Sequence, residues 1–305
     1  MKDPVTVACV QAEPVVLDRE ATLDKLAALT AEAAGEGAQL VVFPETFVSV
    51  YPSSAWAKAF AGWADPRAKA AFAALARSAV EIPGPAADRL GEIAREHGVW
   101  LVTGVNELDP ARNGTVYNAL LYHAPDGSLA LKHRKLVPTN HERLVWGQGD
   151  GGGLRAIETP LGRLGGLICW ENYMPLARFS LYESGVEIYL ASTADDSDAW
   201  QATLVHIARE SRAFVVAPAH FQRASAYPEN FPLRELIEEL DVIGRGGSAI
   251  LAPDGSYLAG PLYEEEGILY AELDPARLLE ERQRFDPAGH YHRPDVLRLT
   301  VTPVE

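Results

Sequence analysis

Short apolar segments alternate with amphipathic helical segments along this chain, and that alternation narrows its possible folds more than any other feature. In the first half, apolar strands are expected at 5–10, 40–43 and 99–105. Helices are expected over 18–35, with a capping aspartate at the start and a glycine at the end, and over 86–97. Strands that alternate with helices in this way predict an α/β fold.

The second half of the chain repeats this pattern. Its expected elements, in order, are strand 164–168, helix 175–184, strand 186–192, helix 196–211, and strands 213–218, 247–252 and 267–273. Two similar halves indicate two sheets packed face to face with helices outside them. The periodicity alone equally allows one doubly wound sheet.

The composition suits one large folded unit. The 305 residues are 48% hydrophobic and 23% charged, which supplies ample apolar material for a large core. No linker rich in serine, glycine or proline and no block of charge divides the chain. A single domain over 1–305 is therefore expected.

Charge and cysteine content limit the functions and the location. The 42 acidic residues outnumber the 27 basic ones and give a net charge of −15, which argues against binding to nucleic acid. The two cysteines, Cys9 and Cys169, make no disulfide framework and suit a reducing compartment. The first residues lack a secretion-signal pattern, and no run approaches about 18 apolar residues. A cytoplasmic protein without a membrane segment is expected.

Cys169 stands where a short apolar strand meets a helix. The stretch RLGGLICWENYMPLAR places it after strand 164–168 and before Pro175, a residue suited to the first turn of a helix. Unpaired N–H groups and the positive end of a helix dipole are expected to lower the pKa of a thiol there and favour the nucleophilic thiolate. The alternative is a buried structural cysteine, which is what we expect of Cys9 in the first strand.

Two charged residues share this position at the end of a strand. Glu45 follows strand 40–43. Lys135 follows the second strand of a hairpin that is predicted around the turn Asp126-Gly127. A thiol nucleophile needs a base that takes its proton and a cation that holds negative charge as it develops. Glu45, Lys135 and Cys169 supply these roles without a histidine, although an isolated glutamate is more often a solvated loop residue.

Four blocks around these residues resemble signature sequences of the nitrilase superfamily of carbon–nitrogen hydrolases. They are FPETF at 43–47, HRKLVPT at 133–139, ERLVWGQGDG at 142–151 and CWENYMPLAR at 169–178. The resemblance is to the nitrilase branch, which converts nitriles into carboxylic acids, and blocks at 200–216, 244–255 and 289–299 extend it along the chain. It implies a four-layer α-β-β-α sandwich and an enzyme that requires no metal or organic cofactor.

The resemblance also implies roles for particular residues. Matches to the family's catalytic positions are Cys169 as nucleophile, Glu45 as general base, Lys135 as the group that stabilises the tetrahedral species, and Glu142 as the glutamate that supports this lysine. Matches to substrate-binding positions are Tyr51, Trp146 and Trp170. The two tryptophans are expected to leave a narrow apolar slot, which fits a linear nitrile better than a planar amide.

Other patterns in the chain are weaker. GQGDGG at 147–152 matches a dinucleotide-binding motif only formally, because no strand runs into it and no helix follows. The pair His290 and His292 and the acidic cluster at 195–198 lack a second ligand group at a recognisable spacing. No metal site is expected.

The expected partners are a small nitrile substrate and further copies of this chain. A homodimer or higher homo-oligomer is implied because relatives pack through helices equivalent to 175–184 and 196–211. Two other interpretations stay open. One is an amidase or carbamoyl hydrolase of the same superfamily with the same residues, and the other is a scaffold that kept the fold without the chemistry.

Overall fold

The computed structural model describes residues 1–112 and 114–302, which form two seven-stranded sheets packed face to face. The first sheet has the order β14-β1-β2-β4-β5-β6, with β3 paired to β4, and the second has the order β11-β12-β10-β9-β8-β7, with β13 paired to β12. The strands of the first sheet are β1 (Val5–Gln11), β2 (Leu40–Val42), β3 (Val80–Glu81), β4 (Trp100–Leu108), β5 (Val116–His123), β6 (Leu129–Arg134) and β14 (Gly267–Leu273). Those of the second are β7 (Ile157–Thr159), β8 (Gly162–Gly166), β9 (Ile188–Leu190), β10 (Phe214–Ala217), β11 (Phe221–Arg223), β12 (Val242–Leu251) and β13 (Tyr257–Tyr263).

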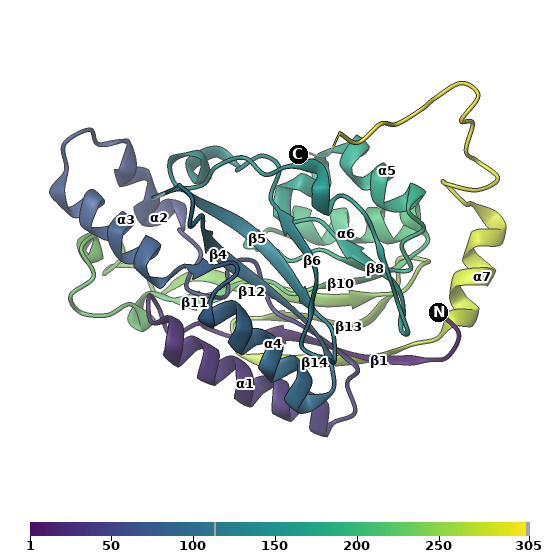
Figure 1. Ribbon diagram of the computed structural model, residues 1–305, viewed down its shortest axis with the longest axis horizontal. Helices are drawn as coiled ribbons and strands as arrows, with labels where there is room; N and C mark the ends of the chain where they lie inside the picture. Colours follow the sequence, from purple (N-terminus) through teal and green to yellow (C-terminus); the bar gives the residue numbers. More distant parts are fainter. Residues whose placement is uncertain (113, 303–305) are drawn as a thin grey trace.

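Helices cover the outer face of each sheet (Figure 1). The first sheet is covered by α1 (Arg19–Gly35) and α4 (Pro85–His97), and the second by α5 (Pro175–Glu183) and α6 (Asp198–Ser211). Further helices are α2 (Ser54–Ala57), α3 (Pro66–Ser78) and α7 (Pro275–Arg284), with short 3-10 turns at Lys58–Ala61, Asn140–Leu144, Gly151–Gly153, Cys169–Tyr173, Ala224–Ala226 and Arg234–Leu236. The expected four-layer α-β-β-α sandwich is confirmed.

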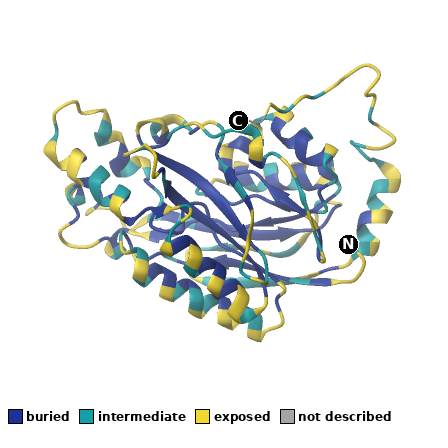
Figure 2. Cartoon of the chain, in the orientation of Figure 1, coloured by how far each residue is buried: buried dark blue, intermediate teal, exposed yellow. Residues whose placement is uncertain are grey.

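Side chains of the central strands alternate between two apolar cores. On β1, Val7 and Cys9 join the core between the sheets, while Ala8 and Val10 pack under α1 and α4. The strands β9 and β10 alternate in the same way between the inter-sheet core and the helices of the second sheet. Figure 2 shows the result: the central strands of both sheets are buried, and exposed residues lie on the outer sides of the helices, in the loops and near the C-terminus. Cys9 is therefore a packing residue, as expected.

The last third of the chain differs most from the expectation. The polar sequence at 222–246 predicts a loop, but β11 overlaps its first residues and β12 begins inside it. The strand β13 and the helix α7 were not predicted, and Gly260 and Pro261 explain the omission of β13 because they disfavour a strand interior. The strand tolerates them because it pairs only with β12, in an irregular register. The assignment of 1–305 to a single domain stays a prediction.

No helix in the described part of the chain is both long and apolar enough to cross a membrane. Helix α1, with 17 residues, carries charged residues along its exposed side.

The buried histidine His123, at the end of β5, provides a test of the packing. Burial lowers its pKa from 6.5 to about 4. Between these values the unfolded chain binds more protons than the folded chain, so this residue makes the protein less stable as the pH falls. For His123→Leu we expect the loss of unfolding free energy between roughly pH 7 and pH 5 to be about 2 kcal/mol smaller than in the parent protein.

Urea denaturation at the two pH values measures this difference. The control is His290→Leu, which replaces an exposed histidine and is expected to keep the pH dependence of the parent. Equal losses for His123→Leu and the parent would show that His123 is not held neutral by the fold.

Candidate active site

Strand ends bring the candidate residues to one edge of the sandwich. Glu45 and Lys135 follow β2 and β6 of the first sheet, and Cys169 and Thr193 follow β8 and β9 of the second. The strands β2 and β4 are parallel, as are β8, β9 and β10, and carboxyl ends of parallel strands meet at the same edge of a sheet. The two edges touch, because the backbone N–H of Ala194 donates to Glu45 Oε2 at 2.8 Å.

A lysine ammonium lies between two buried carboxylates. Lys135 Nζ donates to Glu45 Oε1 at 2.9 Å and to Glu142 Oε2 at 2.7 Å, and none of the three residues is more than 1% exposed. Asn118 Nδ2 donates to Glu45 Oε1 at 2.6 Å, and the Tyr51 hydroxyl donates to Glu142 Oε1 at 2.7 Å. Each carboxylate also accepts one backbone N–H. The three charged groups are thus fixed in position from several directions.

The pKa of Glu45 is raised in this cluster. Burial is the main cause, and the negative charge of Glu142 adds to it, while Lys135 acts in the opposite direction. Burial works to lower the pKa of Lys135, but Glu45, Cys169 and Glu142 together raise it above the ordinary value, so the side chain stays an ammonium. Glu45 is therefore suited to gain and release a proton, as a general base must.

Cys169 lies in a strained turn beside this cluster. Its φ of +52° is in the left-handed region, which costs a residue other than glycine about 1–2 kcal/mol and is enriched at functional sites. Its backbone N–H donates to Ser192 O at 2.9 Å, and the Thr193 hydroxyl donates to Cys169 Sγ at 3.1 Å. The turn thus presents a buried thiol that already has one hydrogen-bond donor.

The pKa of the Cys169 thiol is raised rather than lowered. Burial is the main cause and the charge of Glu45 the next, while Lys135 and the hydroxyl of Thr193 act against them. The expectation of a helix terminus that lowers this pKa is wrong, because Cys169–Tyr173 is a single 3-10 turn and the Cys169 N–H is already bonded to Ser192. Reaction of Cys169 therefore needs a neighbouring base that takes its proton.

The three aromatic residues expected at the substrate are placed differently. The rings of Tyr51 and Trp146 lie 5.9 Å apart by their centroids, and the Trp146 ring is 5.7 Å from Lys135 Nζ. Trp170 is 49% exposed, and its indole N–H donates to Asp195 at 2.7 Å. Tyr51 and Trp146 are thus part of the buried cluster, whereas Trp170 lies at the surface.

Sequence reasoning missed Asn118, Thr193 and His220. The latter two follow β9 and β10, so they occupy the same strand-end position as Cys169, and that repeated position is the signal that could have found them. His220 is buried with its ring centroid 5.9 Å from that of Tyr51, and its Nε2 has no partner among the described residues. Burial lowers the pKa of His220 to about 4, so the imidazole is neutral near neutral pH.

The glycine-rich run at 147–152 packs against the backbone of Lys135. The N–H of Gly149 donates to Lys135 O at 2.8 Å. A Cβ on Gly149 would lie 2.3 Å from the carbonyl oxygen of Arg134, so only glycine fits this close approach. Close packing against the backbone therefore explains the glycines of this run, without a bound nucleotide. Within 1–112 and 114–302, no three His, Cys, Asp or Glu side chains are grouped so that they could hold a metal ion.

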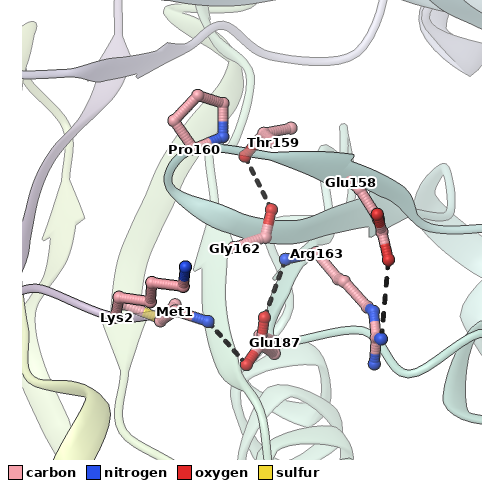
Figure 3. A pocket seen from close by; sticks show the side chains of 8 residues that line it. All are labelled: Met1, Lys2, Glu158, Thr159, Pro160, Gly162, Arg163 and Glu187. Carbon is pink, nitrogen blue, oxygen red and sulfur yellow. Dashed lines mark hydrogen bonds and ion pairs between the residues drawn. The ribbon is translucent and has the colours of Figure 1, made fainter.

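A surface hollow of about 590 Å³ lies apart from these residues (Figure 3). Its lining includes Met1, Arg163 and Glu187, and none of the candidate residues. Arg163 is near the amino end of β8, whereas Cys169 follows the carboxyl end of that strand. The hollow is therefore at the opposite end of the sheet from the candidate site.

Comparisons with known proteins agree with this geometry. Residues 6–283 match the family model of the carbon-nitrogen hydrolases. The chain is 45% identical over 294 residues to an aliphatic nitrilase from Sinorhizobium fredii (strain HH103), and the alignment covers 96% of this chain and 94% of the relative. It is 43% identical over 301 residues to the bifunctional nitrilase/nitrile hydratase NIT4B of Nicotiana tabacum, with 97% and 86% covered. Its fold is similar to the crystal structure of a carbon-nitrogen hydrolase from Helicobacter pylori G27, with a TM-score of 0.74, 22% identity and 96% of each chain covered.

The chain therefore belongs to the carbon-nitrogen hydrolase family, that is, to the nitrilase superfamily. Within it, the relatives at 43% and 45% identity place the chain in the nitrilase branch.

The two cysteines are expected to differ completely in their effect on hydrolysis. Cys169→Ala should reduce the release of ammonia from nitriles by about 1000-fold or more, since no other thiol lies beside the charged cluster. Cys9→Ala removes one core sulfur and should cost about 1 kcal/mol of stability while leaving the rate within about twofold. Substantial hydrolysis by folded Cys169→Ala would rule out Cys169 as the nucleophile.

Proposed function

We propose that the protein is a nitrilase that hydrolyses a nitrile to the carboxylic acid and ammonia, with Cys169 as its nucleophile. The observation that carries this proposal is the buried cluster of Glu45, Lys135 and Glu142 beside the Cys169 thiol. The identity of 43–45% with nitrilases supports nitriles as the substrate class.

The first step joins Cys169 Sγ to the nitrile carbon. The thiol is neutral at rest, so its proton passes to Glu45 as the S–C bond forms and then to the nitrile nitrogen, which yields a thioimidate. Lys135 stabilises the negative charge that develops on the nitrogen. Thr193, whose hydroxyl donates to Sγ, holds the sulfur in place before attack.

Two molecules of water complete the reaction. The oxygen of the first water attacks the thioimidate carbon while Glu45 takes a proton from that water. Glu45 then passes this proton to the nitrogen of the thioimidate. The hydroxyl of the resulting tetrahedral intermediate then gives its proton, through Glu45, to the nitrogen, so that ammonia leaves and a thioester remains. The second water attacks the thioester, the carboxylic acid departs, and the proton returns to Cys169. If sulfur rather than nitrogen leaves the tetrahedral intermediate, the product is the amide.

Glu142 and the aromatic residues support this chemistry. Glu142 accepts hydrogen bonds from Lys135 and from the Tyr51 hydroxyl, and we assign it the role of holding the lysine in position. Burial and the charge of Glu142 raise the pKa of Tyr51, which therefore stays a neutral donor. Substrate contacts are assigned to Tyr51, Trp146 and the more exposed Trp170.

A cytoplasmic location is also proposed, because Cys9 and Cys169 are both unpaired and suit a reducing compartment.

The minimal assembly is proposed to be a homodimer formed through the outer side of α5 and α6. Three large side chains are exposed at the amino end of α5, namely Leu176 on the helix itself and Trp170 and Tyr173 in the 3-10 turn before it. The rings of Trp170 and Tyr173 lie 5.4 Å apart, and the Tyr173 hydroxyl is 2.9 Å from Thr203 Oγ1 on α6. An apolar group of this kind, held together across two elements, is typical of a protein interface.

Product analysis distinguishes a nitrilase from an amidase. With a panel of aliphatic and aromatic nitriles, we expect the acid and ammonia as main products, the amide as a minor product, and slower turnover of each matching amide. The comparison with a bifunctional relative makes the ratio of acid to amide informative. Faster turnover of the amides would transfer the protein to the amidases, and a protein inactive on both classes would be the scaffold.

Assembly is tested by light scattering at micromolar protein. We expect the parent to have twice the mass of one chain or more, and Leu176→Lys to shift it toward the monomer because a charge would enter the apolar interface. The matched control is Leu279→Lys on α7, since Leu176 and Leu279 are similarly exposed at 70% and 76%. A monomeric parent, or equal dissociation in both variants, would contradict this interface.

A further inference from the structure

A third buried carboxylate, Glu171, connects the segment that carries Lys135 to the segment that carries Cys169. Its Oε1 accepts the backbone N–H of Leu136 at 2.6 Å, and its Oε2 accepts the backbone N–H of Ile168 at 2.8 Å. Leu136 follows Lys135 directly and Ile168 precedes Cys169 directly. One side chain thus ties the residue next to the proposed lysine to the residue next to the proposed nucleophile.

His133 completes this arrangement from the first sheet. Its Nε2 lies 2.9 Å from Glu171 Oε2, and both side chains are fully buried. On its other side, His133 is pressed by Gly153, where an added Cβ would lie 2.6 Å from the Cα and the Nδ1 of the histidine. His133 therefore has little freedom to move away from Glu171. We call Glu171, His133 and the two backbone N–H groups the Glu171 clasp.

The electrostatics of Glu171 agree with a permanently ionised clasp. Burial works to raise its pKa, but His133 and the two backbone N–H donors outweigh burial, so the pKa lies below the ordinary value of 4.5. A carboxylate with three fixed donors is suited to hold position, and unsuited to exchange protons with a substrate.

We infer that Glu171 is a positioning residue, which holds Lys135 and Cys169 at the separation that the reaction needs by bridging the two sheets beside them. The inference rests on the proposed function of Lys135 and Cys169. Its physical basis is that a shift of about 1 Å between reacting groups can cost about 100-fold in rate. A left-handed φ at a residue other than glycine persists only where surrounding contacts hold it, and the bonds of Glu171 to Leu136 and Ile168 are among the contacts that hold the turn at Cys169.

Glu171→Gln is the variant that tests the clasp with the least damage. The N–H groups of Leu136 and Ile168 bond to different oxygens of Glu171, and glutamine keeps only one of these oxygens, so its amide group would face one of the two donors. We expect a folded protein in which kcat falls by about 10-fold or more while KM stays within about threefold. The rate at which iodoacetamide alkylates Cys169, followed by mass spectrometry, should fall by a similar factor.

The matched control is Glu187→Gln. Glu187 also accepts a backbone N–H of the Cys169-bearing sheet, from Arg163 at 2.9 Å, but it does so at the far end of β8 (Figure 3). We expect this variant to keep kcat and the alkylation rate within about twofold of the parent even where its melting temperature falls. Parent-like kcat and alkylation in Glu171→Gln, with or without a lower melting temperature, would overturn the inference.

A second pair of variants keeps the test decisive where Glu171→Gln does not fold. His133→Leu removes the side-chain donor to Glu171, and His133→Gln restores an N–H donor of similar reach. For His133→Leu we expect kcat and the alkylation rate of Cys169 to fall several-fold, and for His133→Gln we expect both rates to recover. Equal rates in the two variants would overturn the inference. Alkylation needs no nitrile, so it distinguishes the two possible failures. If only the proposed function is wrong, the parent will not hydrolyse nitriles, but the alkylation rate of its Cys169 will still fall when Glu171 is replaced.

Discussion

The ion pairs of the Lys135 ammonium with Glu45 and Glu142 are buried, and the arrangement of the whole site follows from them. A buried charge that loses its partner costs about 3–5 kcal/mol, so the three side chains must be held together at all times. The fold achieves this by surrounding each carboxylate with further donors, including Asn118 and Tyr51. In the proposed mechanism, this cluster of two carboxylates and one cation keeps Glu45 ready to take a proton from the thiol of Cys169.

The sandwich is the means by which these groups meet. Glu45 and Lys135 come from the first sheet and Cys169 from the second, so the site exists only where the carboxyl ends of two sets of parallel strands face one another. Direct hydrogen bonds join the two edges, from Ala194 to Glu45 and between His133 and Glu171. The packing of the two sheets therefore does more than stabilise the fold, because it also sets the distance between Cys169 and the proposed base.

Much of this arrangement could be predicted from the sequence, for a physical reason. A charged residue or a thiol directly after an apolar strand is visible in the sequence, and Glu45, Lys135 and Cys169 share that position. The burial of the Cys169 thiol and its closeness to Glu45, which raise its pKa, arise only where distant segments pack together, so this raised pKa could not be foreseen. Asn118 and Thr193 also come from such distant segments. The surface position of Trp170 and the edge strand β13 likewise depend on tertiary packing, which overrides local sequence preference.

In the proposed mechanism Glu45 takes the proton of Cys169 inside this cluster. The pH dependence of Cys169 alkylation, compared between the parent and Glu45→Gln, measures whether it does. With Glu45 present, the rate constant for iodoacetamide should change little near neutral pH. In Glu45→Gln it should be lower by about 100-fold, because a general base contributes at least that factor. It should also rise about tenfold per pH unit, because the thiol must then lose its proton to solvent. Equal rates with the same pH dependence in both proteins would contradict the account.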